Sequence, residues 1–235
     1  MPTEHELVLG EQEGGPEVYR QVYYAPTLAG AIKPGQFIML QLPGHWLRRP
    51  FGPAPLDREH LEIFVAPAGA ATRELVQLPM GTRLLALGPL GHPYPLPAER
   101  ALLLAGGKRA GPLVALARVL GSRATARYLP AGSGEECVYQ AFQATGADFA
   151  LAGANDPDLF DPSGEVYILA PDQLAMQLAQ RAFGLGRSGY AGLETAMACG
   201  IGACLACSLA LSSGRVRACR EGAAFPLSEV AKWVP

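Results

Sequence analysis

The stretch Glu194-Thr-Ala-Met-Ala-Cys-Gly-Ile-Gly-Ala-Cys-Leu-Ala-Cys207 contains three cysteines and, with Cys219, gives the spacing C-x4-C-x2-C-x11-C. The first three cysteines match the plant-type iron–sulfur spacing, which a distant fourth cysteine completes. The residues between them are mostly Gly and Ala, so backbone N–H groups can approach the sulfur atoms of an anionic cluster. We therefore predict a two-iron, two-sulfur (2Fe-2S) cluster held by Cys199, Cys204, Cys207 and Cys219.

Two other interpretations of these cysteines stay open at this point. A zinc site with four thiolates usually combines two close C-x2-C units, and this chain has one, from Cys204 to Cys207. Four unrelated buried thiols are the second alternative, because free cysteine is among the most buried residue types. The fifth cysteine, Cys137, stands far from the others in sequence, and we predict that it is a buried thiol and not a ligand.

Length and composition limit the class of protein. The chain has 235 residues, 49% of them hydrophobic and 17% charged, which excludes a disordered chain. A net charge of −2 provides no general basic surface for nucleic acid or an anionic membrane. No apolar run reaches the roughly 20 residues of a membrane helix, and the first residues lack the pattern of a signal peptide. We therefore expect a cytoplasmic protein, in which clustered cysteines favour a metal site over disulfides.

The chain divides into three regions by its sequence pattern. Strand-like runs at 17–24, 35–42, 60–65 and 82–87, bounded by Pro and Gly, predict an antiparallel barrel over residues 1–97. A helix of about 72–78, with Thr72 as its N-cap, interrupts these runs.

The second region, residues 98–187, predicts a small α/β domain. Its first strand is the apolar run Ala101–Ala105, typical of a strand buried on both faces, and the turn Gly106-Gly107 follows it. Further strands are expected at 124–129, 149–151 and 166–169, and helices at 112–120 and 173–183. This alternation of strands and helices is typical of an open α/β sheet. Residues 188–235, which include the Gly-, Ala- and Cys-rich segment, form the third region.

Three short motifs of the barrel region are suited to a nucleotide. Arg49-Pro50-Phe51-Gly52 places a guanidinium, which can pair with a phosphate, two residues before an aromatic ring. Gly69-Ala70-Ala71-Thr72 opens the predicted helix with small residues, so that its free N–H groups can face a pyrophosphate. Gly88-Pro89-Leu90-Gly91 ends the last predicted strand. Taken singly, each motif also fits a plain structural role: a surface arginine, a capped helix or a tight turn.

In this order the motifs resemble the electron-transfer subunit of NAD-linked dihydroorotate dehydrogenase, within the ferredoxin–NADP reductase superfamily. The match is strongest over 189–225, where Cys219-Arg-Glu-Gly-Ala-Ala-Phe225 resembles the family's C-x-x-G-P-x-F. The resemblance implies an FAD-binding barrel, a reduced nucleotide domain and a C-terminal lobe that holds the 2Fe-2S cluster. In the barrel, Arg49 would hold an FAD phosphate and Phe51 would flank the flavin ring. The cofactor-binding residues it implies are Arg49, Pro50, Phe51, Gly52, Gly69, Ala70, Ala71, Thr72, Gly106 and Gly107.

The resemblance also implies a function. The chain would be an oxidoreductase subunit without catalytic residues of its own, acting in pyrimidine biosynthesis. Electrons would pass from dihydroorotate through the FMN of a catalytic partner subunit, then through the cluster and FAD to NAD, within a heterotetramer. Flavin subunits of a hydrogenase or of a ferredoxin–NADP transhydrogenase share these motifs. The alternative from another class is a zinc-bearing interaction module without catalytic activity.

The chain departs from the family where a pyridine nucleotide would bind. Gly52 replaces the usual Ser or Thr, and the family's G-G-G-x-G-x-A-P-L turn is here Gly106-Gly-Lys-Arg-Ala-Gly-Pro-Leu113, one residue shorter and with two cations. The family's Cys-Gly-Pro near the nicotinamide is reduced to Leu169-Ala-Pro171. Lys108 and Arg109 either pair directly with the phosphates or belong to a solvated loop in a decayed site, so NAD binding stays open.

Overall fold

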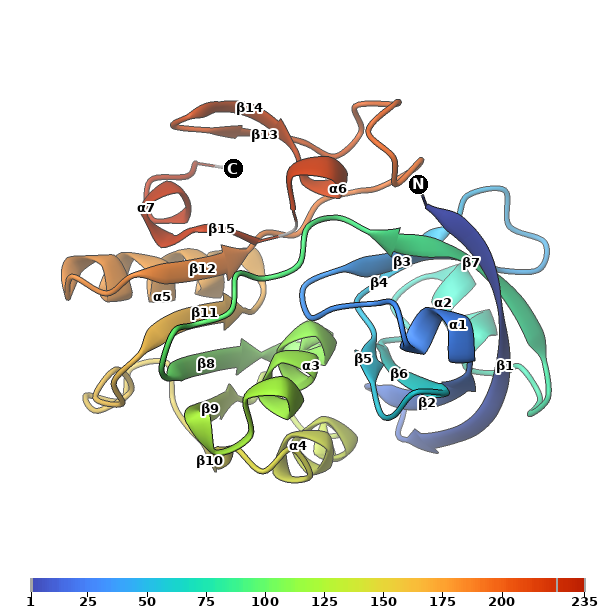
Figure 1. Ribbon diagram of the computed structural model, residues 1–235, viewed down its shortest axis with the longest axis horizontal. Helices are drawn as coiled ribbons and strands as arrows, with labels where there is room; N and C mark the ends of the chain where they lie inside the picture. Colours follow the sequence, from blue (N-terminus) through green and yellow to red (C-terminus); the bar gives the residue numbers. More distant parts are fainter. Residues whose placement is uncertain (1, 223, 235) are drawn as a thin grey trace.

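An antiparallel sheet of seven strands forms the first part of the computed structural model, which describes residues 2–222 and 224–234 (Figure 1). The strand order is β4-β3-β7-β1-β2-β6-β5, and the sheet curls around an aliphatic core that includes Leu7, Ile38 and Leu61. The strands are β1 (Thr3–Gly14), β2 (Tyr19–Tyr24), β3 (Phe37–Gln41), β4 (Arg49–Phe51), β5 (Ala54–Pro55), β6 (His60–Val65) and β7 (Arg83–Leu90), with helices α1 (Pro26–Ala29) and α2 (Ala70–Leu75).

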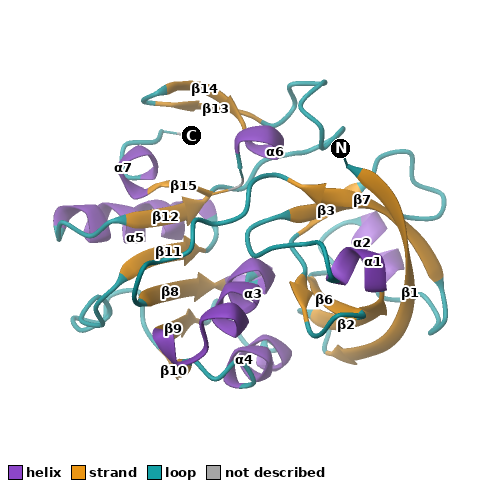
Figure 2. Cartoon of the chain, viewed as in Figure 1, coloured by secondary structure: helices purple, strands orange, loops and turns teal. Residues whose placement is uncertain are grey.

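The second sheet, in the order β10-β9-β8-β11-β12-β15, is parallel except for β15 (Figure 2). Its central strand β8 is buried on both faces. Leu103 belongs to the core beneath helices α3 and α4, whereas Leu102 and Leu104 belong to the core beneath α5 and α7, which explains the uninterrupted apolar run. The elements are β8 (Ala101–Gly106), α3 (Gly111–Leu120), β9 (Ala124–Leu129), α4 (Glu136–Gln143), β10 (Asp148–Leu151), β11 (Glu165–Leu169), α5 (Asp172–Gly184), β12 (Gly189–Gly192) and β15 (Ala224–Pro226).

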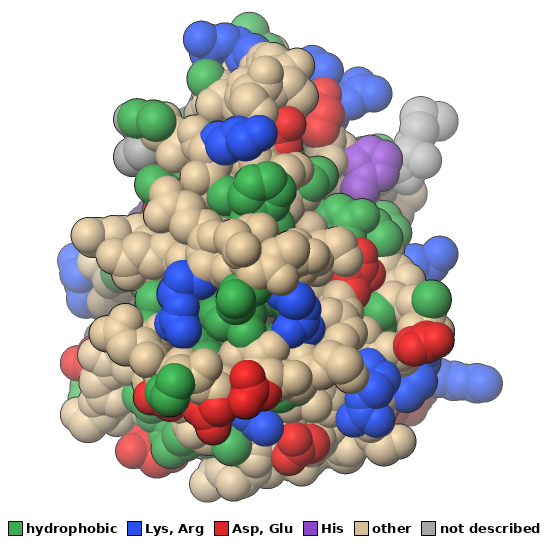
Figure 3. Space-filling view, turned by 90° about the vertical axis from the view of Figure 1, so that its left-hand side faces the viewer, with side chains coloured by type: hydrophobic (Ala, Val, Ile, Leu, Met, Phe, Trp, Pro, Cys, Tyr) green, Lys and Arg blue, Asp and Glu red, His purple; other side chains and the backbone are tan. Residues whose placement is uncertain are grey.

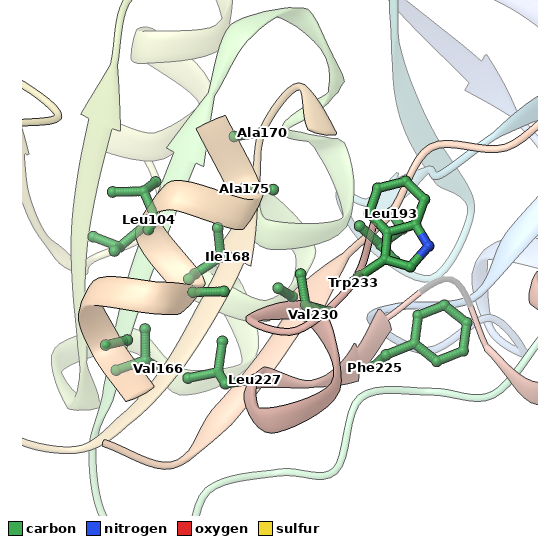
Figure 4. Packing of buried hydrophobic residues seen from close by; sticks show 14 of the residues in the cluster. Leu104, Val166, Ile168, Ala170, Ala175, Leu193, Phe225, Leu227, Val230 and Trp233 are labelled. Atoms are coloured by element: carbon green, nitrogen blue, oxygen red, sulfur yellow. The ribbon is translucent and has the colours of Figure 1, made fainter. Parts of the chain in front are cut away.

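The third region is partly built into this sheet. Strands β12 and β15 pair with each other, and β12 also pairs with β11, so the boundary predicted after residue 187 falls inside the sheet. Helix α7 (Leu227–Val230) and Trp233 close the core over α5 and β11 (Figure 4). Between β12 and β15 the chain forms the hairpin of β13 (Ser208–Leu211) and β14 (Gly214–Arg217), followed by helix α6 (Ala218–Glu221).

Strands β8, β9 and β11 run toward the barrel, so their carboxyl ends lie between the two domains (Figure 1). In open α/β sheets, ligands bind outside the carboxyl ends of the strands. The opposite face, where these strands begin, mixes basic and acidic side chains (Figure 3). The architecture therefore directs attention to the side of the sheet that meets the barrel.

A buried ion network fixes the barrel against the α/β domain. The carboxylate of Glu62, on β6, is fully buried and accepts hydrogen bonds from Arg20 on β2 and Arg118 on α3. Arg118 also donates to the carbonyl of Pro55, at 3.1 Å. The first and second parts of the molecule thus share one carboxylate.

Three local predictions need correction or addition. Helix α2 begins at Ala70 with Gly69 at its N-cap, so the prediction of Thr72 as the N-cap was wrong. The Thr72 hydroxyl instead accepts a hydrogen bond from the Gly69 N–H, at 3.0 Å, which closes the first turn from inside the helix. Strand β1 and helix α4 were not predicted. Within the described ranges, no helix combines the length and the apolar character of a membrane span.

Candidate functional site

The four clustered cysteines form two pairs in the part of the chain around β13, β14 and α6, and these three elements lie at the top of Figure 1. Cys199 and Cys204 belong to the loop between β12 and β13, and the Cys204 N–H donates to Cys199 Sγ at 3.5 Å. Cys207 lies just before β13 and Cys219 lies in α6, with their sulfur atoms 3.1 Å apart. Among the described residues, no three Cys, His, Asp or Glu side chains form a group able to hold a single metal ion. Two pairs of thiols match the number and kind of ligands that a two-iron cluster takes.

The backbone around Cys199 favours a thiolate. Burial acts to raise the pKa of Cys199, but hydrogen bonds from the backbone N–H groups of Cys204, Ile201 and Ala203 lower it to about 6. Burial, together with the adjacent thiol of Cys207, raises the pKa of Cys219 to about 12. The loop therefore directs N–H groups toward sulfur, as a cluster with anionic thiolate ligands requires.

Glycines between the cysteines are required by space as well as by conformation. Gly200 has φ +71°, and a Cβ there would lie 2.6 Å from Cγ of Met39 in β3. Gly202 has φ +83°, and a Cβ there would lie 2.7 Å from Cδ of Arg220. The cysteine loop thus packs directly on the barrel through Gly200, and the residues present fit the predicted cluster.

The flavin motif forms strand β4, which pairs with β3. Arg49 lies opposite Leu40, and Pro50 lies opposite Met39. The Arg49 guanidinium donates to the carbonyl of Leu47 at 2.7 Å, and its neighbour Arg48 has a buried Nη1 with no hydrogen-bond partner in the described part of the chain. A buried guanidinium nitrogen without a partner fits a site for an anion, such as an FAD phosphate.

The small-residue motif at the start of α2 lies close to β4. Phe51 packs against the barrel core that contains Ala71 and Leu75, and His45, in the β3–β4 loop, is 2.8 Å from Glu74 of α2. The structure therefore brings Arg49–Gly52 and Gly69–Thr72 to the same part of the barrel. Gly106 and Gly107 belong to the other domain, at the carboxyl end of β8.

Gly52 makes the contact between the two domains. A Cβ at Gly52 would lie 2.3 Å from Cγ of Pro112, and a Cβ at Gly111 would lie 2.4 Å from the carbonyl oxygen of Gly52. The first turn of α3 occupies the space that the family's Ser or Thr side chain would need. This packing is the physical reason for glycine at position 52.

Several residues at the site carried no signal in the sequence. Met39 and Leu90 lie in barrel strands but share a core with Cys207 and Cys219, so they join the cysteine loop to the barrel. Both are ordinary apolar strand residues, and only the tertiary contact distinguishes them. Cys137 belongs to a different core, in which burial raises the pKa of its thiol to about 11. Ala223, inside the resemblance at the C-terminal end, lies outside the described residues.

Solved structures with the same fold include reductases. The chain is similar to an NADH-dependent reduced ferredoxin–NADP oxidoreductase, with a TM-score of 0.83 and 20% identity over 95% of this chain and 88% of that one. It is also similar to the ferredoxin reductase of carbazole 1,9a-dioxygenase, with a TM-score of 0.65 and 15% identity over 79% and 64% of the two chains. The fold and the cysteine site together define a ferredoxin-reductase-like protein with an iron–sulfur lobe.

The family follows from the sequence comparisons. Residues 194–231 match the family model of the iron–sulfur cluster binding domain of dihydroorotate dehydrogenase B. The NAD(+) electron transfer subunit of dihydroorotate dehydrogenase B from Geobacillus thermodenitrificans is 30% identical, covering 88% of this chain and 92% of the relative. The corresponding subunit from Desulforamulus reducens is 28% identical, covering 92% and 93%. The chain belongs to the family of the electron transfer subunit of dihydroorotate dehydrogenase B.

These findings confirm four predictions: the family, the barrel plus α/β fold, the oxidoreductase class, and FAD and a 2Fe-2S cluster as cofactors. The zinc-bearing module has no support among them. The individual residues that bind the cofactors, and the division at residues 97 and 187, stay predictions.

Proposed function

We propose that this chain passes electrons between a catalytic subunit that contains FMN and oxidises dihydroorotate, and its own FAD, within a cytoplasmic heterotetramer of pyrimidine biosynthesis. One observation carries the proposal: the cysteine loop packs on barrel strand β3, which pairs with the strand β4 that contains the flavin motif. Gly200 contacts Met39, and Met39 pairs with Pro50 of β4. The two predicted cofactor sites are therefore separated by one barrel strand.

Each predicted binding residue has a defined task. Cys199, Cys204, Cys207 and Cys219 would hold the cluster, with the backbone of the loop directing N–H groups to the sulfur atoms. Arg49 and the buried nitrogen of Arg48 would bind the FAD phosphates, with the small residues at the start of α2 beside them. When bound, FAD exchanges electron pairs and the cluster exchanges single electrons. The protein fixes their positions and excludes water from Cys207 and Cys219, which are each 2% exposed.

The outer side of the cysteine loop supports a partner subunit at this position. Cys204 is exposed, and the apolar side chains of Ile201 and Leu205 beside it are 48% and 60% exposed. Leu205 adopts φ +61°, in the left-handed region that non-glycine residues seldom occupy. Exposed apolar side chains grouped beside an exposed cysteine are typical of a surface that another protein covers.

The test is the metal and flavin content of the purified protein. Prepared without oxygen, the chain is expected to contain about two iron and two sulfide per molecule, with the visible absorption of an iron–sulfur cluster, and FAD. Cys204→Ser should lose the cluster, and Cys137→Ser is the matched control that should keep it. Co-purification with a subunit that contains FMN would support the heterotetramer. Stoichiometric zinc without visible absorption would contradict the proposal.

A further inference from the structure

We infer that the turn after β8, where a pyridine nucleotide would bind in this fold, is a clamp between the three parts of the molecule, and that this chain does not bind NAD(H). The inference concerns the electron acceptor, which the proposed function leaves open. It departs from the relatives, which are named as NAD(+) subunits. It rests on four features of the turn η1 (Gly107–Arg109).

First, both cations of the turn are held by carboxylates from other parts of the chain. Lys108 forms an ion pair with Glu17, in the segment between β1 and β2 of the barrel. The Arg109 guanidinium is 2.6 Å from the carboxylate of Glu194, at the start of the cysteine segment. The turn therefore connects the α/β domain to the barrel on one side and to the cysteine segment on the other.

Second, the charge around the turn is unsuited to a pyrophosphate. Glu194 is placed by its own N–H, which donates to Asp172 at 2.7 Å, so a second carboxylate lies beside the first. A dianionic pyrophosphate would have to displace Glu17 and Glu194 from their cations and then remain next to them. Like charges at such distances repel and disfavour binding.

Third, the backbone of the turn is bound from inside the protein. The Tyr128 hydroxyl donates to the carbonyl of Gly107 at 2.7 Å and lies 3.0 Å from a carboxylate oxygen of Glu135, which is fully buried. The turn is a 3₁₀ helix in which Lys108 and Arg109 carry long side chains, whereas a dinucleotide-binding loop has glycines where the pyrophosphate approaches. A dinucleotide site needs the backbone to approach the pyrophosphate closely.

Fourth, the barrel and the helix after the turn are in direct contact. Gly52 and the Gly111-Pro112 turn of α3 pack so closely that neither glycine has room for a Cβ. A nucleotide reaching from the turn to the flavin motif would have to pass this contact. The turn, its ion pairs and this contact all hold the barrel against the α/β domain.

The test uses the purified complex with its partner subunit and bound cofactors, titrated with NADH without oxygen. We expect no saturable bleaching of the flavin up to about 1 mM NADH, whereas dithionite reduces the same flavin. Calorimetry of NAD+ on the same sample, and on the chain without cofactors, should show no binding. Bleaching or binding that saturates at micromolar nucleotide would overturn the inference, and a tenfold weakening in Arg109→Ala would place that binding at this turn.

A second measurement tests the clamp itself. Removing a clamp residue should lower the melting temperature, and about 2–4 °C per 1 kcal/mol is expected for a chain of this size. The variant Lys108→Ala/Arg109→Ala should melt at a lower temperature than Arg83→Ala. Arg83→Ala removes an exposed ion pair with Glu6 that joins two strands of the barrel and no other part of the molecule. Equal melting temperatures would refute the clamp. If the purified wild-type protein contains neither FAD nor iron, the proposed function is refuted. Calorimetry of NAD+ on the chain without cofactors would then still decide whether the chain binds NAD+.

Discussion

Replacing Gly52 by serine restores the family's usual residue and should nevertheless damage this protein. A Cβ at position 52 would lie 2.3 Å from Cγ and 2.9 Å from Cδ of Pro112, and serine adds a further oxygen. The proline ring is rigid and sits in the first turn of α3, so it cannot rotate away as a flexible side chain would. Either β4 or α3 must move.

The magnitude follows from overpacking, which costs about 1–3 kcal/mol when a well-packed contact has to expand. For a chain of this size, about 2–4 °C of melting temperature corresponds to each 1 kcal/mol, so Gly52→Ser should melt about 2–12 °C lower. Because β4 carries the flavin motif, FAD retention should fall as well. Thermal unfolding followed by circular dichroism, and FAD content after gel filtration, measure the two effects.

A double variant isolates the collision. Pro112→Ala removes the ring, so Gly52→Ser in that background should recover a large part of the lost stability, and the two substitutions should be strongly non-additive. The reasoning is refuted if Gly52→Ser alone melts like the wild type and retains FAD more tightly. That result would mean that space for the serine side chain exists at the domain contact.

Two other substitutions test single contacts. Arg49→Ala should weaken FAD binding about ten- to a hundredfold, because it removes a charge-assisted contact worth about 1.5–3 kcal/mol. Arg49→Lys should recover part of the lost affinity. Unchanged affinity of Arg49→Ala in a flavin titration would show that another group holds the phosphate. Gly189→Ala should lower the free energy of unfolding by more than about 3 kcal/mol, because Gly189 has φ +147° and a Cβ there would lie 1.8 Å from the carbonyl oxygen of Val166. A Cβ at Gly184 would meet open space, so Gly184→Ala should melt within about 2 °C of the wild type. Equal melting curves for these two variants would contradict the packing of β12 on β11.

The fold was predictable where local pattern and burial agree. The apolar run Ala101–Ala105 predicted a doubly buried strand because every one of its side chains is inside. Strand β1 was not predicted because only two of its residues, Leu7 and Leu9, are fully buried. Three of its glutamates, Glu4, Glu6 and Glu13, pair with arginines elsewhere in the barrel. Strand β1 is stabilised by pairing with its neighbours β7 and β2, and a local sequence pattern does not reveal this pairing.

The site was predictable to the same degree. Cysteine spacing is a local property, so the ligand set of the cluster could be predicted from the sequence, and it stays a prediction. The contact between Gly200 and Met39 joins residues far apart in the chain, and only the folded structure reveals it. The sequence likewise showed two cations in the turn after β8 but not their partners. Both interpretations of Lys108 and Arg109 missed the carboxylates that bind them, because Glu17 and Glu194 are distant in sequence.

The joints between the three parts differ in strength. Arg20 and Arg118 bind the same fully buried carboxylate. Removing one partner of a buried ion pair costs about 3–5 kcal/mol because the other charge is left buried and unpaired, so separating the α/β domain from the barrel would expose Glu62 to that penalty. The cysteine segment is tied to the turn by Arg109 and Glu194, whose side chains are 66% and 32% exposed, and such pairs contribute at most about 1 kcal/mol. The loop that carries Cys199 and Cys204 is therefore held mainly by its packing on Met39 and Leu90 of the barrel, and the Arg109–Glu194 pair adds little to that attachment.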